Sequence, residues 1–202
     1  MKNKFILLLL FILLVNTIYS QIIKNKVNSF ADELNRYNLF FHMPNGFFAP
    51  DSTISRVFLH NHMFDVDFQI SSNNDSMKVF YIADKQTKEM ERTAKAFFPD
   101  RDMTTQFVKF SLSICKIIGD ENFCNSEVLF YTKKEKKKLN ADQAFEYLIK
   151  LKKPFEEKYT YLKIRSIYKM YFSRVIVFQY FDDLAFENRI DKEFKKMIGF
   201  KK

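Results

Sequence analysis

Apolar residues recur along the chain with two different spacings, and each spacing predicts a type of element. From Arg56 to Ile70 the sequence has the character of a β-strand, and from Phe64 onward every second residue is apolar, which is the period of a half-buried strand. A polar turn at 71–76 and an apolar run at 77–82 follow, so this region is predicted to form a β-hairpin. The same criteria predict further strands at 38–43, 127–132, 160–164 and 175–181.

Other segments show the spacing of amphipathic helices. The last helix is predicted to begin after Asp183 as N-cap and to end at Gly199, where a left-handed C-cap belongs. A helix is also predicted to begin at Asn140, because Gln143 three residues later resembles a capping box. Its apolar face would comprise Ala144, Phe145, Leu148 and Leu151, with Pro154 after its end. Helices are further expected at 22–37, 85–98 and 104–118.

The order of these elements indicates a fold class. One helix and three strands are followed by two helices, a strand, a helix, two strands and a final helix. Strand pairs joined by short loops favour antiparallel pairing. The sequence therefore predicts an α+β fold in which a mostly antiparallel sheet is covered by helices. Residues 21–202 are expected to form this layered sandwich as a single domain.

The N-terminal segment has the layout of a secretory signal peptide. Lys2 and Lys4 precede an uninterrupted apolar run from Phe5 to Val15, which is shorter than the roughly 20 residues of a membrane-spanning helix. Cleavage is expected after Ser20, which would leave a soluble protein that is secreted or periplasmic. Because Ile18-Tyr19-Ser20 fits a cleavage site less well than A-x-A, an uncleaved anchor is the alternative.

The chain contains two cysteines, Cys115 and Cys124. In an oxidising compartment an even number of cysteines indicates a disulfide, and this pair is predicted to form one. Two free buried thiols are the alternative. The spacing between them excludes a CxxC redox or zinc motif.

The chain is basic, with a formal net charge of +9. The densest run is KKEKKK at 133–138, which is interpreted either as a solvated connection before a helix or as an anion-binding site. Partners compatible with this charge are an envelope protein or an anionic glycan or lipid surface, and export makes nucleic acid the least favoured. The abundance of Lys, Asn, Ile, Phe and Tyr together is also what AT-rich codons produce without selection for binding.

Several catalytic and cofactor motifs are absent from the sequence. With only three glycines, neither GxGxxG nor GxxxxGK[ST] occurs, and GxSxG and HExxH are absent too. No cofactor is therefore predicted.

The stretch VFLHNHMFDVDF at 57–68 contains His60 and His62, and with His42 they could form a three-histidine zinc site. On a continuous strand, however, the two imidazoles would share one face while Asp65 and Asp67 point to the other. A site that uses both kinds of ligand requires a bend at His60-Asn61, a position where asparagine favours turns.

Two pairs of adjacent carboxylates are weaker candidates. Glu156-Glu157 and Asp182-Asp183 could serve as the acid and base of a glycosidase. Asp182-Asp183 is better explained as the start of the last helix.

Aromatic and basic residues alternate in the predicted strand near 160. If Leu162 and Ile164 face the core, one outer face would carry Tyr159, Tyr161, Lys163 and Arg165. Such a face could bind a sugar or an anionic partner. The alternative is an ordinary exposed face over which the two basic side chains extend.

A resemblance to PsbP-like domains spans roughly residues 38–200. A strand leading into Met43-Pro44-Asn45-Gly46-Phe47 is similar to the strand-Pro-x-Gly-aromatic entry of these domains. The late strand pair, Asp182-Asp183, the last helix and Ile198-Gly199-Phe200 resemble the way they close. Phe47 stands where the family usually has Trp. The resemblance implies an αβα sandwich with a binding or accessory role and no shared catalytic residues.

Together these patterns favour an exported soluble protein with a non-catalytic binding or accessory role, whose ligand the sequence does not identify. The alternative is a small metal-dependent hydrolase that uses His42, His60 and His62.

Overall fold

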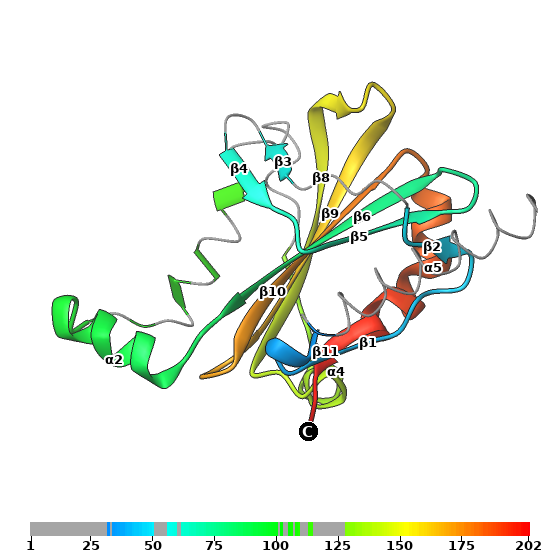
Figure 1. The fold of residues 1–202 in the computed structure, drawn as a ribbon. Coiled ribbons are helices and arrows are strands. Elements are labelled where there is room, and N and C mark those ends of the chain that lie inside the picture. Colours follow the sequence, from blue (N-terminus) through cyan, green and yellow to red (C-terminus); the bar gives the residue numbers. More distant parts are fainter. Residues whose placement is uncertain are drawn as a thin grey trace, which may run out of the picture.

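The computed structural model describes residues 32, 34–50, 56–59, 62–100, 102, 105–106, 108–109, 113–114 and 128–202, with 56–59 and 62–64 described by their backbone. Figure 1 shows a long twisted sheet with α5 (Leu184–Met197) lying across one face. Among the described residues no helix is long and apolar enough to cross a membrane.

The central sheet has seven strands, and every neighbouring pair is antiparallel. In spatial order the strands are β2 (Phe47–Phe48), β5 (Phe68–Ser72), β6 (Met77–Lys85), β10 (Ser173–Phe181), β9 (Tyr159–Lys169), β8 (Gln143–Phe155) and β7 (Leu129–Phe130). This sheet with its covering helices confirms the predicted α+β fold. The turn between β9 and β10, which no sequence signal located, lies at 170–172.

Apolar side chains are buried on both faces of the sheet. In β10, Val175 and Val177 belong to the core cluster that includes Phe194 and Met197 of α5, whereas Phe178 belongs to a second cluster on the opposite face. The second cluster also contains Ile114. Burial of both faces explains why β6 and β10 are apolar over consecutive positions instead of alternating.

A second, two-stranded sheet joins the two ends of the described chain. Here β1 (Leu39–Phe41) pairs with β11 (Ile198–Phe200), which directly follows α5. Gly199 was predicted to end the helix in a left-handed C-cap, and this is wrong, because Ile198 is the extended C-cap and Gly199 pairs with Phe40. A Cβ at Gly199 would lie 2.7 Å from Phe40 Cζ and 2.9 Å from the Leu139 carbonyl oxygen. Close packing therefore explains this glycine.

The helix predicted to begin at Asn140 is also wrong, because residues 143–155 form β8. Phe145, Tyr147, Ile149 and Leu151 alternate along β8 and are buried in the second cluster. Ala144 and Leu148 contribute to the other core, so the two buried faces together imitate a helical pattern.

The helix lies one segment earlier, in the lysine run. This helix, α4 (Lys133–Leu139), begins at Thr132 with a capping box to Glu135. It ends at Asn140, whose φ of 50° is left-handed. The lysine run is therefore a helix and not the connection that one interpretation expected.

Residues 56–70 contain three strands instead of a long one. A separate antiparallel hairpin is formed by β3 (Arg56–Leu59) and β4 (His62–Asp65), with Leu59 opposite His62. The chain thus reverses at the position predicted to bend, between Leu59 and His62. After β4 the Asp67 carboxylate accepts a 2.6 Å hydrogen bond from the Ala83 amide, and β5 then pairs with β6 as the predicted hairpin.

Two other helix predictions are confirmed. The predicted helix at 85–98 is α2 (Lys88–Phe97), capped by Thr87. Asp183 caps α5 by accepting a 2.7 Å hydrogen bond from the Ala185 amide. Of the helices predicted at 22–37 and 104–118, residues 32, 34–36, 105–106, 108–109 and 113–114 are helical. The signal peptide, Cys115 and Cys124 lie outside the described residues.

Substitution of Gly199 by alanine should destabilise the fold by about 1–3 kcal/mol, because the added methyl overpacks the contact between β1, β11 and α4. Thermal melts of the wild type and the variant measure this loss. Phe40→Leu removes the ring but leaves the Leu139 carbonyl. The double variant Phe40→Leu/Gly199→Ala should therefore regain only part of the stability that Gly199→Ala loses. An unchanged melting temperature for Gly199→Ala would contradict the packing explanation.

Candidate functional site

A group of charged side chains lies between α5 and the sheet. Glu146 of β8 and Lys163 and Arg165 of β9 come from the sheet, and α5 contributes Glu187, Asp191 and Lys195. Three cations therefore face three carboxylates. Buried charges are tolerated when they are paired and hydrogen-bonded. Every charge in this group has a partner of opposite sign, while Nη1 of Arg165 has no hydrogen-bond partner among the described residues.

Arg165 is at the centre of this charged group and is only 2% exposed. Its Nε donates a 2.8 Å hydrogen bond to Glu146 Oε2, and its Nη2 donates to Asp191. The guanidinium also lies 5.8 Å from the centre of the Phe194 ring. Arg165 therefore links β8, β9 and α5 in one contact.

Two lysines complete the group. Lys163 Nζ lies 2.7 Å from both Glu187 Oε1 and Asp191 Oδ1. Lys195 Nζ lies 3.3 Å from Glu146 Oε1 and 3.2 Å from Asp191 Oδ2. Each carboxylate is thus shared by at least two cations, which favours a fixed arrangement over separate exchangeable pairs.

The charged group sets the ionisation of its members. Burial opposes ionisation of Asp191, but the charges of Arg165 and Lys163 outweigh it and lower its pKa to about 2. The same balance lowers the pKa of Glu146. For Glu187 burial wins, and its pKa is raised. Glu146 and Asp191 therefore remain carboxylates at neutral pH.

Tyr131 connects this charged group to the surface. Its hydroxyl donates a 2.7 Å hydrogen bond to Glu146 Oε2, and burial raises its pKa well above the ordinary value. Lys195 Nζ lies 5.6 Å from the centre of the Tyr131 ring. Tyr131 is thus a protonated phenol that the charged group holds in place. Because its hydroxyl stays protonated, it is not a base at neutral pH.

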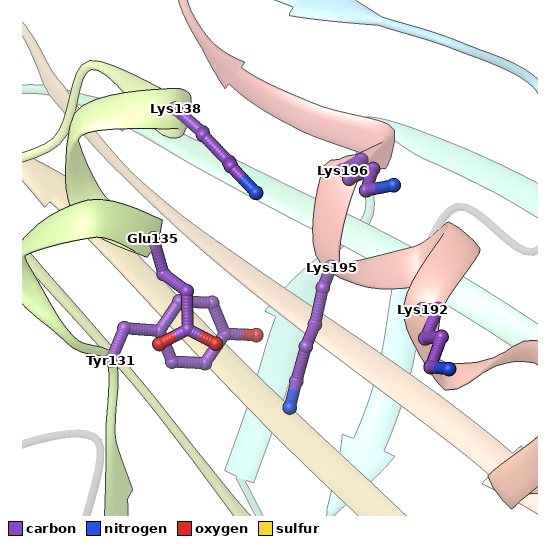
Figure 2. Close-up of a pocket in the computed structure, with 6 residues that line it drawn as sticks. All are labelled: Tyr131, Glu135, Lys138, Lys192, Lys195 and Lys196. Atoms are coloured by element: carbon purple, nitrogen blue, oxygen red, sulfur yellow. The ribbon is translucent and has the colours of Figure 1, made fainter.

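A pocket of about 200 Å³ opens above these two residues, between α4 and α5. It is lined by Tyr131, Glu135, Lys138, Lys192, Lys195 and Lys196. Figure 2 shows Lys138 and Lys195 directed into the space between the helices, with Tyr131 and Glu135 on the α4 side. We call this the lysine pocket.

The lysine pocket carries an excess of positive charge. Glu135 accepts a 2.8 Å hydrogen bond from the Thr132 amide, and its hydrogen bonds with Thr132 lower its pKa. Lys195 is paired within the charged group. Within the described part of the chain, Lys138, Lys192 and Lys196 have no carboxylate partner. Their three ammonium groups give the pocket the chemistry of an anion site.

The outer face predicted for Tyr159, Tyr161, Lys163 and Arg165 does not form. Lys163 and Arg165 lie beneath α5, and Tyr159 is buried, with its hydroxyl donating a 2.8 Å hydrogen bond to Asp75. Tyr161 stacks on Phe181 at 5.8 Å. The prediction failed because α5 covers this face with acidic side chains.

A signal for this covering was present in the sequence. Glu187, Asp191 and Lys195 recur every four residues along α5, and Glu146 interrupts an apolar strand. Spacing of four places side chains on the same side of a helix. Acids on that side, opposite basic residues of a strand, are the pattern from which the charged group could have been predicted.

The predicted histidine site lies mostly outside the described residues. His42 is exposed, and its ring lies 5.5 Å from that of Phe40. The backbone of His62 belongs to β4, whereas its side chain and His60 are not described. Among the residues whose side chains are described, no cluster of three or more metal-ligating groups occurs. The three-histidine site stays a prediction.

The carboxylate pairs are found at structural positions. Asp183 caps α5, as the alternative interpretation expected. Glu156 and Glu157 form the turn between β8 and β9 with φ values of 51° and 58°, and Glu156 pairs with Lys78.

Comparison of the chain with protein-family models and with curated proteins finds no match. The PsbP-like resemblance is therefore a prediction that these comparisons do not test.

Replacement of Arg165 by methionine should cost about 3–5 kcal/mol of stability, because it leaves Glu146 and Asp191 as poorly compensated buried charges. Chemical denaturation measures this change. Arg174→Met is the matched control on the same sheet, since it removes the more exposed pair with Asp84 and should cost at most about 1 kcal/mol. Equal losses in the two variants would contradict a central role for Arg165.

Proposed function

We propose that this chain is a non-catalytic binding or accessory domain whose ligand carries a negatively charged group, bound in the lysine pocket. The observation that carries the proposal is the pocket beside Tyr131 whose lining includes four lysines, Lys138 of α4 and Lys192, Lys195 and Lys196 of α5. Figure 2 shows Lys138 and Lys195 directed into the space between the two helices. Lysines near the C-terminal ends of helices are favourable in themselves because they complement the helix dipole. Because lysines from two helices line the same pocket, their positive charges repel one another. A bound anion would reduce this repulsion.

The surroundings of the pocket suit binding better than catalysis. Tyr131 is hydrogen-bonded to Glu146, and Lys195 is paired with Glu146 and Asp191. These groups form a fixed floor, and a rigid floor reduces the ordering cost of binding. Neither is poised to exchange a proton with a ligand, because both are committed to the charged group below.

The order of elements is consistent with the PsbP-like resemblance. The strand entering Pro44 is β1, and the closing Ile198-Gly199-Phe200 is β11, with which it pairs. A domain of this kind would have a binding or accessory role, because PsbP-like domains have no catalytic residues in common. The partners that we propose are an envelope protein or an anionic glycan or lipid surface.

Export is the second part of this proposal. A basic start, an apolar run from Phe5 to Val15 and a polar end at Ser20 support cleavage by a signal peptidase. N-terminal sequencing of the protein recovered from the envelope or the medium should find Gln21 as the first residue. Recovery of the chain in the cytoplasm with its N-terminus intact would contradict export.

Anion binding can be tested with inorganic tripolyphosphate by isothermal titration calorimetry. The wild type should bind it with an affinity that falls as salt is added. The double variant Lys192→Gln/Lys196→Gln should bind about tenfold or more weakly, since a charged hydrogen bond contributes roughly 1.5 kcal/mol or more.

The matched control is Lys152→Gln/Lys153→Gln, which removes the same charge from two exposed positions of β8. It should bind like the wild type. An equal loss of affinity in this control would show attraction to net charge alone, and absence of wild-type binding would refute the anion site.

A further inference from the structure

The register of the sheet brings several segments together at one end of the molecule. Lys85 of β6 lies opposite Ser173 of β10, and Gln143 of β8 lies opposite Tyr168 of β9. The turn at 170–172, the start of α2 and the end of α4 therefore share this end. The C-terminus lies there too, because Asn140 Nδ2 donates a 2.6 Å hydrogen bond to the Lys201 carbonyl (Figure 1).

The 170–172 turn presents three large apolar side chains to solvent. Met170 is 36% exposed, and Tyr171 and Phe172 are each 42% exposed. The Met170 amide donates a 2.7 Å hydrogen bond to Asp142, and the Phe172 carbonyl accepts a 2.9 Å hydrogen bond from the Gln86 amide. The backbone thus holds these side chains outward in a fixed turn, which we call the apolar tip.

Lysines surround the apolar tip. Lys88 Nζ lies 5.3 Å from the centre of the Tyr171 ring, and Lys169 Nζ lies 5.7 Å from that of Phe172. The five lysines of α4 and the C-terminal Lys201 and Lys202 lie at the same end. Two of the carboxylates here are already engaged, Asp142 with the Met170 amide and Asp84 with Arg174.

The opposite end of the sheet has a different charge. There Lys158 pairs with Asp75 at 2.8 Å, and Lys78 pairs with Glu156. Glu157, Asp182 and Asp183 lie at the same end, beside the β8–β9 turn and the start of α5. The exposed Lys152 and Lys153 of β8 also lie at this end, where the carboxylates of Glu157, Asp182 and Asp183 offset their charge. Net positive charge is therefore concentrated at the end that carries the apolar tip.

We propose that this end docks on an anionic lipid bilayer, with Met170, Tyr171 and Phe172 at the boundary between headgroups and acyl chains. Aromatic side chains favour this depth, and lysines near the surface are attracted to anionic headgroups. A small apolar contact alone anchors weakly, whereas a contact combined with a basic patch binds stably. A soluble polyanion would use the lysines but would give the apolar tip no favourable contact.

This surface narrows the partners named in the proposed function to an anionic bilayer, and it is a contact separate from the lysine pocket, because the apolar tip does not line that pocket. The test uses co-sedimentation of the protein with vesicles of phosphatidylcholine alone and of phosphatidylcholine mixed with phosphatidylglycerol. The wild type should bind the mixed vesicles and not the neutral ones. Met170→Ser/Phe172→Ser should weaken this binding about tenfold or more, because the exposed parts of the two side chains together match roughly one fully buried apolar side chain. Tyr171 is kept because its φ of 65° restricts substitution.

The matched control is Phe48→Ser/Leu184→Ser, which removes an exposed aromatic and an exposed aliphatic side chain at the opposite end. It should bind mixed vesicles like the wild type, and thermal melts establish that both variants are folded. Wild-type binding to neutral vesicles, no binding to mixed ones, or equal binding by the tip variant would each overturn the proposal.

Titration of the tip variant with tripolyphosphate separates this proposal from the lysine pocket. Unchanged affinity for tripolyphosphate with lost vesicle binding supports a separate bilayer contact. An equal loss of both would show that the apolar tip acts through the pocket, and would overturn a separate docking surface.

Discussion

The contact on which the rest of the structure depends is that of Arg165 with Glu146 and Asp191 beneath α5. It fixes the terminal helix to β8 and β9, which lie between the central strand β10 and the edge strand β7. From this position α5 leads directly into β11, which pairs with β1 and so closes the second sheet. The lysine pocket follows from the same contact, since its floor consists of Tyr131 and Lys195, both bound to Glu146. A buried arginine is expensive to desolvate, and its three-way connection explains why it is tolerated here.

The second constraint is that both faces of the sheet are buried. It determines which helices and strands could be predicted from the sequence. The terminal helix could be predicted because it has one apolar side and a polar start at Asp183. The β5–β6 hairpin could be predicted because the polar turn at residues 71–76 separates an alternating strand from an apolar run. In β8 both faces are buried, so Phe145 and Ala144 are both apolar and the strand period disappears. Gly199 was misread for a related reason. Its position next to Phe40 depends on a strand far away in the sequence, and no local pattern reports that contact.

The candidate site could not be predicted from the sequence, because it is formed by segments that are far apart in the chain. Lys163 and Arg165 look like an exposed basic face as long as α5 is not placed, and α5 can be placed only from its spacing of Glu187 and Asp191 against Glu146. The lysine pocket similarly requires α4 and α5 side by side, although their lysines are separated by more than fifty positions in the chain. Residue types were therefore readable from the sequence, while their pairing was a property of the tertiary structure alone.

The distribution of acids explains why a modest excess of lysine becomes a basic surface. Glu146, Glu187 and Asp191 compensate buried cations, Glu135 and Asp183 cap helices, and Asp67 accepts from the Ala83 amide. Acids engaged in the fold are not available to neutralise the outer lysines of α4, the end of α5 or the C-terminus. A codon bias toward lysine accounts for the number of cations but not for their position. Their concentration at the end with the apolar tip, opposite an end where Lys78 and Lys158 are paired, is a feature of the fold. It gives the molecule a charge polarity, and in the proposed docking this polarity would orient the molecule toward an anionic surface before contact.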